Sequence, residues 1–131
     1  MKVLYVAGAG VPDEGAAIGE LAALEPCLDI RSVEGASAAL GEIRSDDQYR
    51  AVFLSPFLSH NEALALIASL RRDRVPVAVV AIITTEHRHF FAQALTGGAD
   101  DVLMLGDTGL ISSEDTLRRI RHSRHVEPGN H

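Results

Sequence analysis

The stretch Val75–Ile83, VPVAVVAII, is a run of small and β-branched apolar residues in this 131-residue chain. Its residues do not alternate between apolar and polar, as they would in a strand with one face in water. A strand that is buried on both faces is typical of a parallel sheet covered by helices on each side. We therefore predict that this stretch is a central strand of an α/β domain.

Four further apolar runs lie on either side of this strand and alternate with amphipathic segments. The other predicted strands are Val3–Val6, Leu28–Val33, Ala51–Leu54 and Val102–Leu105. The segments between them carry apolar residues at helical spacing, namely Ile18, Leu21, Ala22 and Leu24; Ala38, Leu40 and Ile43; Leu64, Ile67 and Leu70; Phe90, Phe91, Ala94 and Leu95; and Leu117 and Ile120. Gly97 and Gly98 are expected to end the fourth helix, and Ser112 and Asp115 to open the last one. Five strand–helix units with short connections predict a flavodoxin-like (βα)5 three-layer sandwich, whose five-stranded parallel sheet has the order 2-1-3-4-5.

Length and composition indicate one globular domain. The chain is 47% hydrophobic and 23% charged, and it is too short for two domains. We assign residues 1–125 to the domain and residues 126–131 to the start of a linker, because the tail loses its apolar periodicity and contains Pro128 and Gly129. The net charge of −6 argues against direct nucleic-acid binding.

The same features predict a cytoplasmic domain without a membrane anchor. The N-terminal apolar run is too short for a signal peptide and has no cleavage site after it. No apolar stretch reaches the roughly 18 residues that a membrane span needs. The single cysteine, Cys27, cannot form an internal disulfide and fits a reducing compartment. We expect Cys27 to be a small core residue, since no base or cation lies near it in sequence.

Each predicted strand ends on small or neutral residues. The first strand leads to Ala7 and Gly8, the third to Ser55 and the fifth to Leu105. In open α/β sheets, ligands and chemistry sit at the carboxyl ends of the strands. No phosphate or metal site with charged residues is therefore expected at these ends.

Three segments give the chain a family resemblance. Residues 63–71, ALALIASLR, match the helix that follows the phosphoacceptor strand of a receiver domain, and residues 76–80 match its proline-led fourth strand. Residues 98–107, GADDVLMLGD, match the stretch GADDYLxKP around the fifth strand. Together with the five strand–helix units, they make the chain similar to the CheY-like receiver domain of two-component response regulators over about residues 2–125.

The resemblance allows the functional positions of a receiver to be compared residue by residue. The acidic pair that holds Mg²⁺ falls at Ala7 and Gly8, the phosphoacceptor aspartate at Ser55, the switch tyrosine or phenylalanine at Val102 and the lysine at Leu105. The threonine or serine after the fourth strand falls at Ala81 or Ile83 by counting, with Thr84 or Thr85 as its alternatives.

This comparison predicts a degenerate pseudo-receiver. Mg²⁺ requires several hard oxygen ligands, which Ala7, Gly8 and Ser55 do not supply, so Mg²⁺ binding is expected to be lost and no other cofactor is expected. A serine hydroxyl cannot form an acyl phosphate, so the chain is not expected to accept phosphate from a histidine kinase. No nucleophile–base pair is visible either, and we do not expect an enzyme.

The resemblance also implies an interaction surface on helix 4, strand 5 and helix 5. Its candidate residues are His87, Phe90, Phe91, Arg118 and Arg121. The predicted function is phosphorylation-independent signalling by protein–protein interaction within a bacterial two-component-type regulator. Its partner would be another protein, a second copy bound through this surface, or an attached histidine kinase, diguanylate cyclase or DNA-binding domain.

A different class of function remains open. The arginines at the ends of the third helix (Arg71, Arg72 and Arg74) and the last helix (Arg118–Arg124) can bind an anionic nucleotide of the cyclic dinucleotide type. The chain would then be a ligand-sensing pseudo-receiver that controls an output domain. We favour the simpler interpretation that these cations are solvated and offset the negative ends of helix dipoles.

Two weaker patterns favour ordinary structural roles. Gly8, Ala9 and Gly10 follow a strand, but Asp13 stands where the dinucleotide-binding motif needs its third glycine. The six histidines lack the cysteines or carboxylates that would complete a metal site. We expect neither a dinucleotide nor a metal at these positions.

Overall fold

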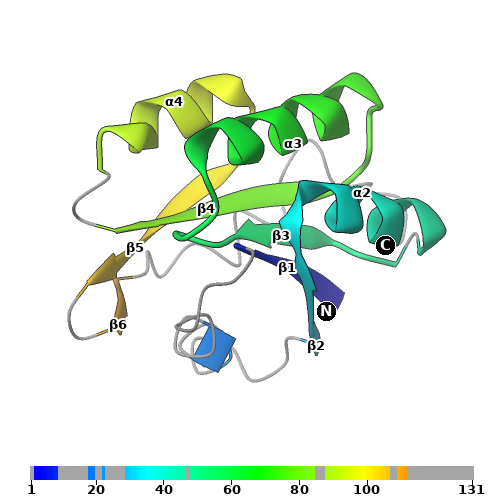
Figure 1. Ribbon diagram of the computed structural model, residues 1–131, viewed down its shortest axis with the longest axis horizontal. Helices are drawn as coiled ribbons and strands as arrows, with labels where there is room; N and C mark the ends of the chain where they lie inside the picture. The colour runs from blue at the N-terminus through cyan, green and yellow to red at the C-terminus, as the bar shows by residue number, and fades with distance from the viewer. Residues whose placement is uncertain are drawn as a thin grey trace, which may run out of the picture.

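A six-stranded sheet forms the centre of the protein (Figure 1). The structure is a computed structural model, and it describes residues 2–8, 18, 19, 22, 29–46, 48–84, 88–106 and 109–111. The strands are β1 (Lys2–Ala7), β2 (Asp29–Glu34), β3 (Ala51–Leu54), β4 (Ala78–Thr84), β5 (Asp101–Gly106) and β6 (Gly109–Ile111). They lie in the order β2-β1-β3-β4-β5-β6.

The first five strands confirm the predicted topology. All four pairs among them are parallel, and their order is 2-1-3-4-5. The connections return the chain to the same end of the sheet before each strand, which is the parallel arrangement that strand–helix alternation favours.

The sixth strand was not predicted. It pairs with β5 in the antiparallel direction, with Gly106 opposite Gly109 and Met104 opposite Ile111. Only two residues separate the paired glycines, as in a tight hairpin. A three-residue strand is too short to leave a periodic pattern in the sequence.

The helix predicted from Ser112 onward and the apolar residues Leu21 and Leu24 of the predicted first helix lie outside the described residues.

The central strand β4 begins at Ala78, three residues later than predicted. Pro76 has no N–H to donate to a neighbouring strand. The amide of Val77 donates to the carbonyl of Val75, so this segment turns on itself before the ladder starts. From Ala78 to Ile83 every residue is buried, as the unbroken apolar run predicted.

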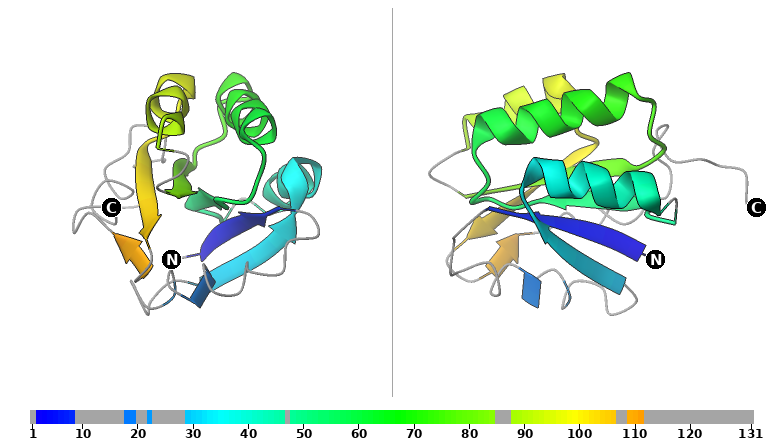
Figure 2. Two further views of the ribbon diagram at one scale, coloured as in Figure 1. Left: turned by 60° about the vertical axis from the view of Figure 1, so that its left-hand side comes forward. Right: turned by 45° about the vertical axis from the view of Figure 1, so that its right-hand side comes forward.

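Three helices cover one face of the sheet (Figures 1 and 2). They are α2 (Gly35–Ser45), α3 (His60–Arg72) and α4 (Phe90–Gly97). Their buried residues recur at helical spacing and pack on the sheet, namely Ala39 and Ile43; Ala63, Leu66, Ile67 and Leu70; and Phe90 and Ala94.

The predicted inner face of α4 was wrong at one position. Leu95 is 39% exposed, whereas Phe90 and Ala94 are buried. Because each residue turns a helix by about 100°, Leu95 points away from the face that its neighbour Ala94 buries. Gly98 ends the helix with a φ of 117°, which confirms the predicted glycine cap.

The opposite face of the sheet is also apolar. A second cluster on that face has Ile18 packed against it and includes Val3, Tyr5, Ala7, Phe53, Val80, Ile82 and Leu103. Strands β1, β3 and β4 are therefore buried on both faces, which fits the predicted three-layer arrangement.

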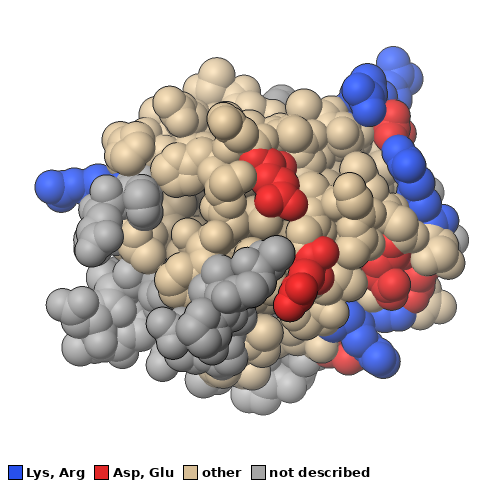
Figure 3. Space-filling view, in the orientation of Figure 1, with Lys and Arg blue, Asp and Glu red and all other residues tan. Residues whose placement is uncertain are grey.

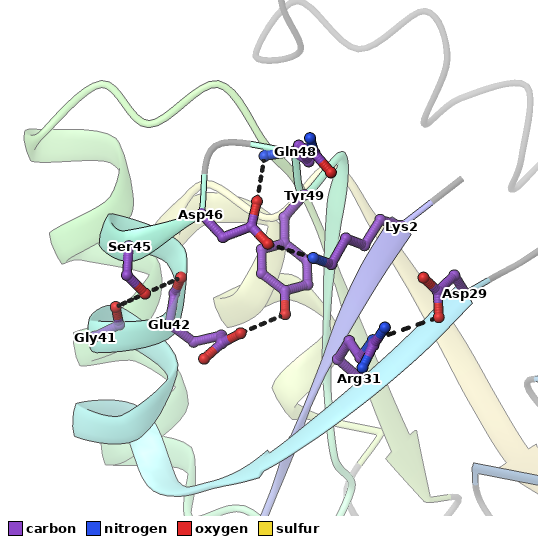
Figure 4. Close-up of polar contacts among 9 residues, drawn as sticks. All are labelled: Lys2, Asp29, Arg31, Gly41, Glu42, Ser45, Asp46, Gln48 and Tyr49. Atoms are coloured by element: carbon purple, nitrogen blue, oxygen red, sulfur yellow. Dashed lines mark hydrogen bonds and ion pairs between the residues drawn. The ribbon is translucent and has the colours of Figure 1, made fainter.

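A polar cluster joins the start of β1 to the end of α2 (Figure 4). The ammonium of Lys2 pairs with the carboxylate of Asp46 and lies 4.8 Å from the centre of the Tyr49 ring. The Tyr49 hydroxyl donates a hydrogen bond to Glu42 at 2.8 Å. The hydrogen bond from Lys2 lowers the pKa of Asp46 below its usual value, and burial raises the pKa of Tyr49 to about 12. Asp46 is therefore ionised and Tyr49 neutral at ordinary pH.

A second polar cluster ties the end of α3 to the starts of β4 and β5. The guanidinium of Arg71 donates to the carboxylate of Asp100 at 2.7 Å, to the carbonyl of Gly98 at 3.0 Å and to the carbonyl of Val77 at 2.9 Å. The Asp100 carboxylate also accepts the Val79 amide at 2.8 Å. Arg71 is largely buried in these contacts, so it belongs to the structural frame and not to the arginine surface predicted for a nucleotide.

Candidate functional site

The carboxyl ends of the four inner strands meet at one edge of the sheet. In register, Val6 lies beside Leu54 and Leu54 beside Ala81, while β4 and β5 run on in the same direction to Thr84 beside Leu105. The residues that follow β1 and β3 in the chain are Gly8 and Ser55, so the predicted positions come together here. The Ser55 amide donates to the carbonyl of Val6 at 3.0 Å and joins the two strand ends.

Ser55 is used to build the turn that leads into α3. Its side-chain oxygen accepts the Phe57 amide at 3.0 Å, and its carbonyl accepts the Leu58 amide at 3.2 Å. The residue is only 4% exposed. A serine side chain whose oxygen accepts the amide two residues later commonly stabilises a turn. Ser55 thus faces its own backbone and presents little surface to solvent.

Gly8 lies against the backbone of the same turn. A Cβ atom at this position would be 2.7 Å from the carbonyl oxygen of Phe57 and 3.0 Å from its carbonyl carbon. The first distance is shorter than real Cβ contacts allow, so the turn would have to move to admit any side chain. An aspartate at position 8 does not fit this arrangement.

The space beneath the turn is small and mostly apolar. The cavity has a volume of about 10 Å³, which is roughly room for one water molecule. Its lining comes from both sheet and helices, namely Leu54, Ser55, Pro56, Leu58, His60, Ala63, Ala81, Ile82, Ile83 and Phe90. A nucleotide or phosphorylated side chain cannot enter a cavity of this size.

These residues do not fit Mg²⁺. The predicted ligand positions Ala7 and Gly8 have no polar side chain, and the Ser55 oxygen already accepts a backbone amide. Among the described residues, no group of three or more histidine, cysteine or acidic side chains is placed to hold a metal ion. A divalent cation with a preference for carboxylate oxygens therefore lacks a set of ligands in the described part of this edge.

The remaining receiver positions lie on β4 and β5. Val102 is buried in the cluster beneath α2, α3 and α4. Thr84 is the last residue of β4, and its backbone lies opposite Leu105 of β5. The Thr84 hydroxyl is buried and makes no hydrogen bond to any described residue. Thr85 lies outside the described residues.

Three aromatic rings connect the starts of α3 and α4, and sequence reasoning missed their association. The His60 ring stacks on Phe90 at 4.0 Å with an angle of 6° between the planes. The His89 ring meets His60 edge-on at 5.6 Å. His60 follows Ser59, which caps α3 by accepting the Glu62 amide at 3.1 Å. This S-x-x-E pattern is a recognisable helix start, but a partner ring on another helix leaves no local signal.

The predicted interaction residues are only partly within the described chain. Phe90 is buried between α4 and the sheet, so its ring does not belong to an exposed surface. His87, Arg118 and Arg121 lie outside the described residues, as does the side chain of Phe91. Among the residues that the structure describes, the exposed large apolar ones are Leu95 on α4 and Phe57 in the turn after β3.

Comparison with solved structures identifies the fold. A two-component response regulator from Clostridium difficile is 25% identical, with a TM-score of 0.61 over 79% of this chain and 82% of that one. The receiver domain of NtrX from Brucella abortus is 20% identical, with a TM-score of 0.65 over 92% of this chain and 99% of that one. The protein has the receiver-domain fold.

A longer NtrX chain from Brucella abortus is also similar, with 25% identity and a TM-score of 0.63. The match covers 79% of this chain and 23% of that one, so in NtrX the receiver fold is one part of a larger protein. No protein-family model and no curated protein matches the sequence. Within the described part of the receiver fold, none of the helices has the length and apolar character to cross a membrane.

Proposed function

We propose that this receiver fold works as a phosphorylation-independent pseudo-receiver, which acts by protein–protein interaction within a bacterial two-component-type regulator. The observation that carries the proposal is the contact between Gly8 and Phe57. The backbone of the turn occupies the place where the receiver resemblance would put an acidic side chain. On this proposal, the described strand ends supply neither ligands for Mg²⁺ nor an aspartate to accept phosphate, and the domain acts through its partner.

The surface of α4 supports the interaction half of the proposal. The helix has the sequence FFAQALTG and carries no charged residue. Its exposed residues include Leu95, and the space-filling view has no red or blue over α4 (Figure 3). Depletion of charge at the centre of a patch, with an exposed leucine, is characteristic of protein interfaces. The partner is a second copy of the domain or an output module of the regulator.

Replacing Leu95 with glutamate tests this surface. Sedimentation velocity of the unmodified protein should give a concentration-dependent dimer, or a stable complex with an output module expressed together with it. Leu95→Glu should weaken either assembly by about tenfold or more, because a charge would be buried in an apolar contact. The matched control is Ala38→Glu, which adds the same charge at an exposed position of α2.

Comparing the two variants shows whether the assembly depends on the α4 surface or is weakened by any added negative charge. An assembly that is unaffected by Leu95→Glu, or one that Ala38→Glu weakens to the same degree, would contradict the assignment of the interface to α4. An unchanged thermal unfolding transition in both variants would verify that the change acts on binding and not on folding.

The alternative function, a ligand-sensing pseudo-receiver, is less well supported than protein–protein interaction. Arg71 is committed to Asp100 and two backbone carbonyls, so it is not free to bind a nucleotide phosphate. A thermal-shift series with cyclic dinucleotides distinguishes the two functions, because a ligand that binds the folded state raises its melting temperature. The interaction function predicts no such rise.

A further inference from the structure

Three exposed arginines gather where α2 and α3 end. Arg44 lies in the last turn of α2, Arg72 in the last turn of α3, and Arg74 just beyond it. The Arg44 and Arg72 side chains are 62% and 72% exposed. We call these three residues the arginine patch. In the space-filling view, blue atoms gather on the right, over the ends of these two helices (Figure 3).

The patch has more positive than negative charge. Among the residues that the structure describes, Asp73 is the carboxylate that forms ion pairs with it, at 3.1 Å from Arg44 and 3.6 Å from Arg72. One carboxylate cannot balance three guanidinium groups, and the negative ends of two helix dipoles offset them only in part. This positive surface stands out on a chain whose net charge is −6.

Arg74 occupies a backbone position that glycine would adopt with less strain, which suggests that its side chain has a role beyond ending α3. The end of α3 is a Schellman motif, in which the Val75 amide donates to Leu70 at 3.0 Å and the Arg74 amide to Arg71 at 3.2 Å. Arg74 occupies the left-handed position of this motif, with a φ of 54°. Glycine is the favoured residue there because a Cβ atom strains the backbone. The same chain places a glycine, Gly98, at the left-handed end of α4.

We propose that the arginine patch binds an acidic segment of a partner protein. The guanidinium groups come from two neighbouring helices, whose axes in packed pairs are about 8–10 Å apart, so they suit an extended chain of carboxylates. A single small anion fits less well, because Asp73 lies between Arg44 and Arg72 and repels it. A nucleic acid is disfavoured by the overall charge of −6. This inference rests on the proposed interaction function and deepens it, but it uses a surface other than α4.

The test measures binding of an acidic probe by fluorescence anisotropy at low salt. The probe is a labelled peptide of alternating glutamate and serine, and the competitors are a single-stranded oligonucleotide of equal charge and inorganic phosphate. Arg74→Gly and Arg72→Ala should each weaken peptide binding by about three- to tenfold. Arg31→Ala is the matched control, since Arg31 is 61% exposed, lies on β2 and pairs with Asp29.

Arg74→Gly gives the sharpest result because folding and binding should change in opposite directions. Relief of the left-handed strain should raise the melting temperature by about 2–5 °C while peptide affinity falls. Loss of binding can then not be a consequence of unfolding. Leu95→Glu should leave peptide binding unchanged, so failure of the α4 proposal and failure of this one are distinguishable.

Several results would overturn the assignment. One is the absence of saturable peptide binding. Another is a loss of peptide affinity in Arg31→Ala as large as that in Arg74→Gly, since any exposed cation would then bind the peptide. A third is tighter binding of the oligonucleotide or of inorganic phosphate than of the peptide, which would identify a phosphate-binding surface.

Discussion

Single residues at the strand ends determine what this receiver fold can do. Gly8 lets the turn after β3 approach β1, and Ser55 holds that turn through the Phe57 amide. The family resemblance aligned acidic positions of a receiver with Gly8 and Ser55, neither of which carries a carboxylate. It could not predict that the turn fills the place of the missing side chain, because that contact joins residues far apart in the chain. We therefore expect that an acidic side chain restored at position 8 would have to displace this turn.

Gly8→Ala should destabilise the protein. Its Cβ atom would meet the Phe57 carbonyl group at 2.7–3.0 Å, and overpacking against backbone typically costs about 1–3 kcal/mol of unfolding free energy. Gly41→Ala is the control, because Gly41 is exposed within α2 and a Cβ atom added there would have no neighbouring atom within 4 Å. That variant should gain about 0.5–1 kcal/mol from helix propensity.

Urea unfolding of both variants provides the measurement. A Gly8→Ala protein as stable as the unmodified one would mean that the turn moves freely and that the contact does not close the site.

The helices and strands were predicted to different degrees, for physical reasons. The five parallel strands follow from unbroken apolar runs alternating with amphipathic segments, which leave few ways to order the sheet. Leu95 was misplaced because two adjacent apolar residues on a helix do not reveal which of them faces the core. The role of Arg71 was missed because its partner, Asp100, lies far from it in the chain. Clusters that join distant elements leave no mark on local sequence.

The cluster between β1 and α2 should make stability depend on acid pH through Asp46. The hydrogen bond from Lys2 lowers the pKa of this carboxyl below its ordinary value of 3.8. A lowered pKa in the folded state contributes stability that is present above pH 3.8 and is lost as the pH falls through the folded value. Asp46→Asn should therefore be less stable than the unmodified protein near neutral pH, and the difference should shrink in acid.

Urea midpoints of both proteins, compared from near neutral pH to well below 3.8, would measure this convergence. Asp29→Asn is the control, because Asp29 is mostly exposed and pairs with Arg31 at 3.5 Å. A constant difference between Asp46→Asn and the unmodified protein across this range would contradict the role of the ionised carboxylate.

At the scale of the whole molecule, the two edges of the sheet have different characters. In the described part of the chain, the carboxyl-end edge, where a receiver would be phosphorylated, carries uncharged residues that pack closely around a small cavity. The opposite edge holds the Lys2 and Arg71 clusters and the arginine patch. The receiver fold was predictable from sequence, since it rests on strand order and local motifs. The difference in charge between its two edges was not predictable, because it depends on which charged residues folding brings together.

Phosphotransfer tests the central proposal most directly. The protein is incubated with acetyl phosphate and Mg²⁺, alongside a phosphorylatable receiver as the positive control, and its intact mass is measured. We predict no Mg²⁺-dependent gain of a phosphoryl group on this protein while the control is labelled. A Mg²⁺-dependent, acid-stable or acid-labile phosphoryl group on the folded protein would contradict the account.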